Sequence, residues 1–155
     1  MNTSRLVFQF LAEPNDVNFG GKVHGGAVMK WIDQTGFACA SAWATSYCVT
    51  VYVGGIRFMK PILIGDLVKV EAKIIYTGNS SMHIAVDVSS KRVDGKDFAK
   101  TTHCIIVFVA VDENGKTISV PKWHPITEKE LEQEKHAVKL MDLRKTIENE
   151  MFPFK

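Results

Sequence analysis

The chain has 155 residues, of which 46% are hydrophobic and 23% charged, and its formal net charge is +2. This length suits one domain with a buried core, the composition excludes general disorder, and the small net charge gives no reason to expect a nucleic-acid partner. The three cysteines form no Cys-x-x-Cys pair and are odd in number, which indicates reduced thiols. No signal-peptide pattern or long apolar span occurs, so we expect a cytoplasmic protein that does not enter a membrane.

The first part of the chain predicts a short strand, a glycine-rich loop and a long helix. Apolar residues alternate over positions 6–10, which is typical of a strand. Turn formers and two glycine pairs, at 20–21 and 25–26, follow. Residues 27–43 are then so uniformly apolar that we expect a helix buried on most of its sides.

The middle of the chain predicts consecutive strands joined by short turns. Extended, β-branched or alternating patterns cover residues 48–64, 68–76, 82–88 and 98–111. Short connections of this kind imply an antiparallel sheet, and the preceding helix must cover one of its faces. The sequence therefore predicts an α+β fold.

A second helix is expected at the C-terminal end. Thr127 and Glu130 have the spacing of a capping box, and apolar residues recur among charges beyond them. This helix either rests on its own domain with a solvated outer face or contacts another subunit. The apolar stripe consists of Leu131, Val138, Leu140, Met141 and Ile147.

The glycine-rich loop and the helix carry a recognisable motif, N-x-x-G-x-x-x-G-G-x-x-M-x-W-I-D, from Asn18 to Asp33. Together with V-T-V, F-M-K-P-x-x-x-G-D and a T-G-x-S-S turn, it resembles the hotdog-fold acyl-CoA thioesterases, in particular their YciA-like branch. The resemblance spans residues 6–121. It implies a hotdog domain, which we assign to residues 1–125, in which an antiparallel sheet wraps around one long α-helix. The second helix then forms an amphipathic extension over residues 126–155.

The resemblance also implies the activity and the assembly. The expected reaction is hydrolysis of an acyl-coenzyme A thioester by water to fatty acid and CoA, with the thioester as substrate and without a metal or cofactor. It implies a homodimer with the two sheets joined edge to edge, three of which commonly form a hexamer. Each site would combine Asn18 of one subunit with Asp33 of the other.

The residues themselves fit this chemistry. Asp33 is the one carboxylate on the apolar helix and is the candidate general base or nucleophile. The backbone N–H groups of Gly25 and Gly26 begin that helix and are candidate oxyanion donors. Gly26 and Asp33 are seven residues apart, about 10 Å along a helix, so one carbonyl cannot touch both. Two antiparallel helices in a dimer would remove this difficulty, because the start of one could face Asp33 of the other.

The sequence also allows structural roles for the same residues. Asn18 suits a turn with a left-handed backbone as well as it suits the thioester or the attacking water. Asp33 could simply pair with Lys30 one turn earlier. His24 could cap or pack against the helix start, or act as a donor or acid.

Coenzyme A needs basic and polar groups for its phosphates and pantetheine arm. The F-M-K-P segment, the basic pair at 91–92, the 77–81 turn and the V-T-V segment offer such groups. The candidate substrate-binding residues are His24, Thr50, Lys60, Thr77, Gly78, Ser80, Ser81, Lys91 and Arg92.

Other chemistries receive less support from the sequence. The histidines and cysteines lack metal-ligand spacing, so no metal is expected, and His103 and Cys104 should point to opposite faces of a strand. Two alternatives to hydrolysis stay open. One is a hotdog hydratase or dehydratase acting on an acyl-CoA or acyl-carrier substrate, with His24 as its catalytic histidine, and the other is a non-catalytic module that binds acyl-CoA or nucleotide.

Overall fold

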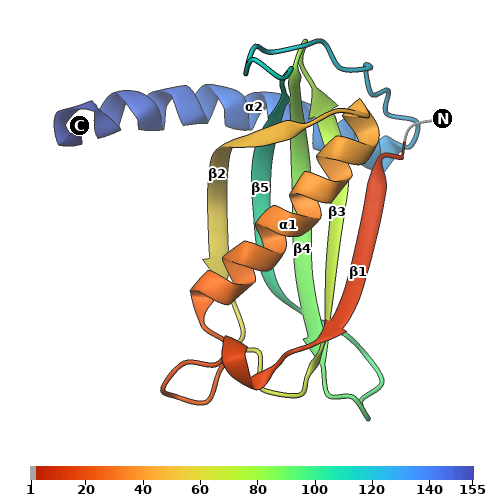
Figure 1. Cartoon of the computed structure of the whole chain (residues 1–155), viewed down its shortest axis with the longest axis vertical. Coiled ribbons are helices and arrows are strands. Elements are labelled where there is room, and N and C mark those ends of the chain that lie inside the picture. Colours follow the sequence, from red (N-terminus) through yellow and green to blue (C-terminus); the bar gives the residue numbers. More distant parts are fainter. Residues whose placement is uncertain (1–2) are drawn as a thin grey trace.

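A computed structural model describes residues 3–155 and shows an antiparallel sheet with a long helix, α1, on one face (Figure 1). The sheet order is β1-β3-β4-β5-β2, which confirms the α+β prediction. The strands are β1 (Arg5–Leu11), β2 (Cys48–Phe58), β3 (Leu67–Thr77), β4 (Ser81–Lys91) and β5 (Ala99–Ala110). The helices are α1 (Gly25–Ala44), α2 (Glu128–Met151) and the short 3-10 turns Pro14–Asp16 and Phe152–Phe154.

The core lies between α1 and the face of the sheet that it covers. Alternate residues of β3, from Val68 to Ile74, are fully buried, as the period of two in the sequence predicts. Gly36 lets the helix approach β5 closely, because a Cβ atom there would lie 2.8 Å from the Phe108 ring. The position of α1 along the sheet therefore depends on the absence of a side chain at this residue.

The expectation that α1 is buried on most of its sides is wrong for the single chain. Its sheet-facing side is buried, but Met29, Asp33 and Phe37 form an exposed ridge at a spacing of four residues. A single sheet covers only one side of a helix, and apolar composition alone cannot reveal that a second cover is missing. This exposed ridge carries the candidate catalytic carboxylate.

β2 is an edge strand and is less regular than the sequence suggests. Its pairing with β5 shifts between Thr50 and Tyr52 and again between Gly54 and Arg57. The extended segment expected to reach residue 64 ends at Phe58, and the chain then turns through Pro61. Lys60, expected on this strand, lies in the following loop.

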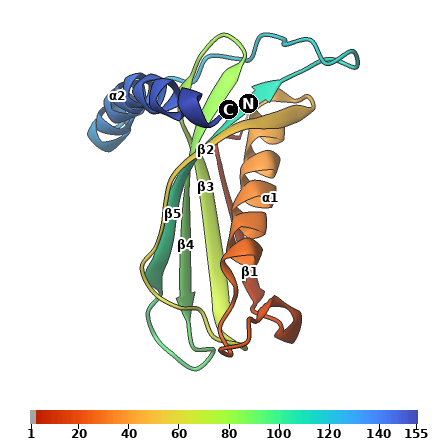
Figure 2. The ribbon, with the colours of Figure 1, turned by 90° about the vertical axis from the view of Figure 1, so that its left-hand side faces the viewer.

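α2 lies across the other face of the sheet, away from α1 (Figure 2). The capping box is confirmed: the Thr127 hydroxyl accepts from the Glu130 N–H at 3.1 Å, and the Glu130 carboxylate accepts from the Thr127 N–H at 3.2 Å. Ala137 is the one buried residue of α2, and it packs in a cluster with Ile75 and Ala85. The domain division at residue 125 stays a prediction. Within residues 3–155, no helix has the length and apolarity needed to span a membrane.

Candidate active site

Asn18 organises the loop before α1 with its side-chain oxygen. Its Oδ1 atom accepts from the backbone N–H groups of Gly20 at 2.8 Å and Lys22 at 3.2 Å. The left-handed residue of this loop is Gly21, with φ of 78°, so the alternative of a left-handed backbone at Asn18 is wrong, although Asn18 does hold the turn through its side chain. Because both acceptor contacts fix Oδ1, the amide N–H₂ group is the part of Asn18 that remains for a ligand.

The start of α1 leaves backbone donors open. His24 is the N-cap, and its Nδ1 atom accepts from the Ala27 N–H at 2.9 Å. This is the capping role considered for His24, and it places the proton of a neutral ring on Nε2. Within residues 3–155, the N–H groups of Gly25 and Gly26 make no hydrogen bond. They lie at the positive end of the helix, where an oxyanion is stabilised.

A cavity of about 350 Å³ lies between the loop that contains Asn18 and the start of α1. Asn18, Gly25 and Lys60 line it, so three candidate residues that are distant in sequence share one cavity. Phe58 forms part of its wall and lies against Gly25, where a Cβ atom would come within 3.4 Å of the ring. The wall is largely apolar, which suits a site that excludes water from a thioester.

Asp33 and Thr50 form the other part of the candidate site. The Thr50 hydroxyl, on β2, donates to Asp33 Oδ1 at 2.6 Å. Both residues are exposed, and no ion pair joins Asp33 to Lys30 among the described residues. The structural alternative of a Lys30 pair is therefore wrong. Thr50 fixes the orientation of the carboxylate, while Oδ2 makes no hydrogen bond in residues 3–155 and can receive a proton or attack.

Within one chain, the two parts of the site are separated along α1. Gly25 and Asp33 are eight residues apart, which corresponds to about 12 Å of helix. Asp33 does not line the cavity that contains Asn18 and Gly25. A single chain thus carries the candidate groups in two separate places, which we call half-sites: one has a carboxylate and the other has hydrogen-bond donors.

The 77–81 turn lies at the opposite end of the sheet from the loop before α1 and from the loop that joins β2 to β3 (Figure 1). The Thr77 side chain is buried, and its hydroxyl accepts from the Trp123 N–H at 2.9 Å. The Gly78 N–H donates to the Ser81 carbonyl at 2.9 Å, and the Ser80 carbonyl accepts from Ala110. The Thr77 hydroxyl thus holds the chain after β5, whereas the serine hydroxyls of this turn make no hydrogen bond in residues 3–155.

Lys91 and Arg92 lie at the same end of the sheet as the cavity and already have local contacts. Lys91 Nζ donates to the Gly95 carbonyl at 3.3 Å, and Arg92 pairs with Asp94 at 3.2 Å on the surface. An exposed pair of this kind contributes little to stability and is easily exchanged for a phosphate. The CoA-binding roles of these residues stay predictions.

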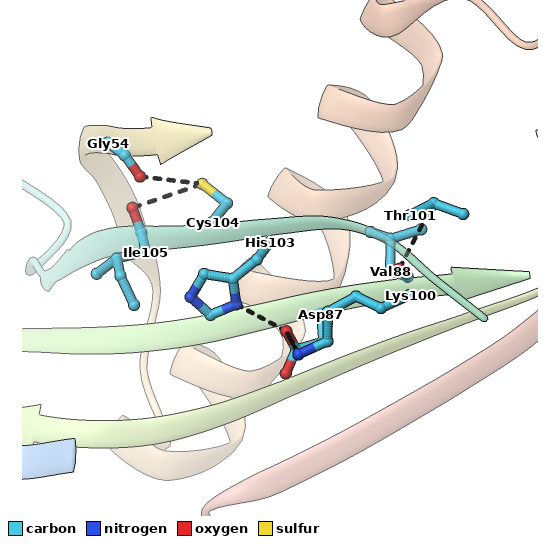
Figure 3. A network of polar contacts seen from close by, with 8 residues as sticks. All are labelled: Gly54, Asp87, Val88, Lys100, Thr101, His103, Cys104 and Ile105. Carbon is cyan, nitrogen blue, oxygen red and sulfur yellow. Dashed lines mark hydrogen bonds and ion pairs between the residues drawn. The ribbon is translucent and has the colours of Figure 1, made fainter. Parts of the chain in front are cut away.

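The outer face of the sheet carries a polar network that the sequence does not reveal (Figure 3). His103 Nδ1 lies 2.7 Å from Asp87 Oδ1, and Lys100 Nζ lies 3.0 Å from the same oxygen. Burial alone would raise the pKa of Asp87, but the hydrogen bonds and charges of His103 and Lys100 lower it below its usual value. Cys104 points to the other face, as predicted, and burial raises its pKa to about 11, so its thiol stays protonated.

Other residues at the site also escape prediction from the sequence. Phe58, Met59 and Thr102 line the cavity with Asn18. Phe58 and Met59 belong to the F-M-K-P motif, but only its lysine was a candidate from the sequence, because it carries the charge that could bind a phosphate. Thr102 carries no signal, since it reaches the cavity only through the pairing of β5 with β2 at Phe58.

Comparison with known proteins assigns the family. The family model described as Thioesterase superfamily matches residues 20–94. The chain is 34% identical over 119 residues to the acyl-CoA thioester hydrolase YciA of Escherichia coli, covering 75% of this chain and 90% of that protein. It superposes on an apo-hexameric acyl-CoA thioesterase with a TM-score of 0.88 and 32% identity, covering 92% of this chain and 91% of the other.

A further structural neighbour has an acyl-CoA bound to it. It is an acyl-CoA hydrolase from Staphylococcus aureus in complex with butyryl coenzyme A, coenzyme A and coenzyme A disulfide. Its TM-score is 0.88 at 27% identity, with 97% of this chain and 92% of that chain covered. The motif from Asn18 to Asp33, the fold and these relatives agree, and the chain belongs to the hotdog-fold acyl-CoA thioester hydrolases.

Proposed function

We propose that this protein hydrolyses acyl-CoA thioesters at sites shared by two copies of the chain. The observation that carries the proposal is the pair of half-sites on α1. Asp33, held by Thr50, provides a carboxylate, and the helix start with Asn18 provides donors. Antiparallel pairing of two α1 helices brings Asp33 of one copy to the cavity of the other, so a homodimer has two sites.

The role proposed for each group follows from those of its donor or acceptor atoms that make no hydrogen bond within residues 3–155. The amide N–H₂ of Asn18 and the N–H groups of Gly25 and Gly26 donate to the thioester oxygen, where negative charge develops. Asp33 either takes a proton from water or attacks the carbonyl carbon, and both routes use its free Oδ2 atom. The thiolate of coenzyme A leaves, and the fatty acid is released.

The relatives support the substrate and the assembly. The S. aureus hydrolase binds butyryl coenzyme A, and one structural neighbour is a hexamer. Variants of the S. aureus enzyme replace an asparagine and an aspartate by alanine, and the interval between these two positions equals that from Asn18 to Asp33. We therefore infer an acyl-CoA substrate for this chain, and a dimer that assembles further into a hexamer.

Complementation between two inactive variants tests the shared site. Asn18→Asp keeps an oxygen for the Gly20 and Lys22 N–H groups but removes the amide donors, and Asp33→Ala removes the carboxylate. Each alone should release little thiol from acyl-CoA. Co-expressed, half of the dimers are mixed and each mixed dimer has one intact site, so about one quarter of wild-type turnover should return.

The same assay separates the other outcomes. No recovery on co-expression, with both variants folded, would place Asn18 and Asp33 in one subunit's site. Near-normal turnover of either single variant would remove that residue from the mechanism. A change in unsaturation of the acyl chain without thiol release would identify a dehydratase, and binding without either product would identify a binding module.

A further inference from the structure

The second half of α2 runs beyond the sheet that it covers. Figure 1 shows α2 crossing β2, the edge strand, and continuing past it. On the helix, Leu140, Leu143 and Ile147 are 44%, 58% and 53% exposed. These three residues recur at the spacing of one helix face, so they form a continuous apolar flank.

A cavity of about 300 Å³ separates this flank from the outer face of the sheet. Tyr52, Gly54 and Ile105 belong to its floor, and Leu140, Leu143 and Ile147 belong to its side. The sheet lies on the side of α2 marked by Ala137, which is about 120° around the helix from Leu143. The apolar flank therefore faces sideways over the sheet rather than down onto it.

The proposed pairing of α1 fixes where a second copy lies. Asp33 is level with Thr50 through their hydrogen bond, and Gly25 is level with Phe58 through their contact. When Asp33 of one copy faces the helix start of the other, Thr50 of one β2 strand lies opposite Phe58 of the second. The symmetry axis then passes midway between these positions, at Gly54, which is a floor residue of the cavity.

α2 crosses β2 close to that axis. The Arg144 guanidinium lies 4.9 Å from the centre of the Tyr52 ring, and Tyr52 is two residues from Gly54. The α2 helix of the second copy crosses its own β2 strand two residues from the axis on the opposite side. The two crossing points are therefore four residues apart along the strand, which is about 13 Å at 3.3 Å per residue. The register shift between Gly54 and Arg57 shortens this toward the 8–10 Å of packed helices.

We infer that the α2 helices of two edge-to-edge copies pack antiparallel over the outer face and close this cavity from both sides with Leu140, Leu143 and Ile147. The inference rests on the antiparallel dimer of the proposed function. With Arg144 near the axis, Leu143 lies close to its own symmetry mate, and Leu140 of one copy lies beside Ile147 of the other. Each Arg144 brings its own counter-charge, because Glu148 lies 3.7 Å from it.

Disulfide formation between introduced cysteines tests this register. The three native cysteines are buried and do not interfere. Leu143→Cys should form a covalent dimer on mild oxidation, since residues at the axis meet the 4.4–6.8 Å Cα separation of a disulfide. Lys145→Cys is the matched control, because it lies equally near the axis but about 200° around the helix, on the other flank. It should remain monomeric on a non-reducing gel.

A mixed pair tests the antiparallel direction. Co-expressed chains with Leu140→Cys and Ile147→Cys should join to each other, whereas Leu140→Cys alone should not, because the two copies of residue 140 are offset by about 10 Å. Absence of any Leu143→Cys dimer, equal linkage of Lys145→Cys, or self-linkage of Leu140→Cys would each overturn the inference. Thiol release by the unoxidised variants shows that they are folded. Complementation of Asn18→Asp with Asp33→Ala reports on α1 separately, so failure of the shared active site is distinguishable from failure of α2 pairing.

Discussion

Acidification should destabilise this fold through His83, a buried residue of β4. Burial, together with the nearby charge of Arg144, lowers the pKa of His83 from 6.5 to about 4. The ring packs edge-on against Tyr76, with centroids 5.1 Å apart, in surroundings that favour the neutral form. Because the unfolded chain binds this proton more readily, the stability from His83 is complete above pH 6.5 and is lost as the pH falls toward 4. The loss amounts to about 3 kcal/mol of the free energy of unfolding.

Urea unfolding at several pH values between 7 and 4 measures this loss, with His83→Gln as the reference. Glutamine is similar in size but takes up no proton in this range, so its unfolding free energy should fall less steeply than that of the wild type. The difference between the two proteins isolates His83 from the carboxylates that titrate lower, Asp87 among them. Equal slopes for wild type and His83→Gln between pH 6.5 and 4.5 would refute the reasoning.

Three further substitutions have expected outcomes. Thr50→Val removes the hydrogen bond to Asp33 and should lower kcat by about tenfold to a hundredfold with little change in KM, while Thr50→Ser should retain most activity in steady-state kinetics. Gly36→Ala places a Cβ atom 2.8 Å from the Phe108 ring and should cost about 1–3 kcal/mol in urea unfolding, with an unchanged stability counting against this packing. Thr127→Ala removes the N-cap of α2 and should cost about 1 kcal/mol, whereas Thr127→Ser should be nearly neutral.

The order and type of the secondary structure could be predicted because the local sequence pattern of each element agrees with the conformation that the element adopts. The alternation over residues 6–10, the apolar run after Gly26 and the Thr127 capping box each specify a local conformation. Where a prediction from the sequence is wrong, the structure of that segment depends on contacts with other segments. The apolar composition of α1 does not indicate that the sheet covers only one side of this helix. The extended pattern beyond Phe58 does not indicate that pairing with β5 stops there.

The candidate site was predictable only in part for the same reason. Asn18 and Asp33 belong to one motif, and the helical spacing of Gly26 and Asp33 led to the proposal that each site combines two copies of the chain. The partner of Asp33 is Thr50, which comes from another element, so the hydrogen bond depends on how β2 lies beside α1. The pairing of Asp87 with His103 follows from the register of β4 against β5, which no local pattern encodes.

The irregular pairing of β2 limits what this edge can bind. A long, regular edge strand offers its free N–H and C=O groups to any other strand and invites open-ended aggregation. Here the two register shifts, with Gly55 at a φ of 65°, break the strand into short regular pieces around Gly54. A second copy related by a twofold axis presents the same shifts in reversed order. In the proposed dimer the two β2 edges cover each other, which favours a closed dimer over a growing fibre.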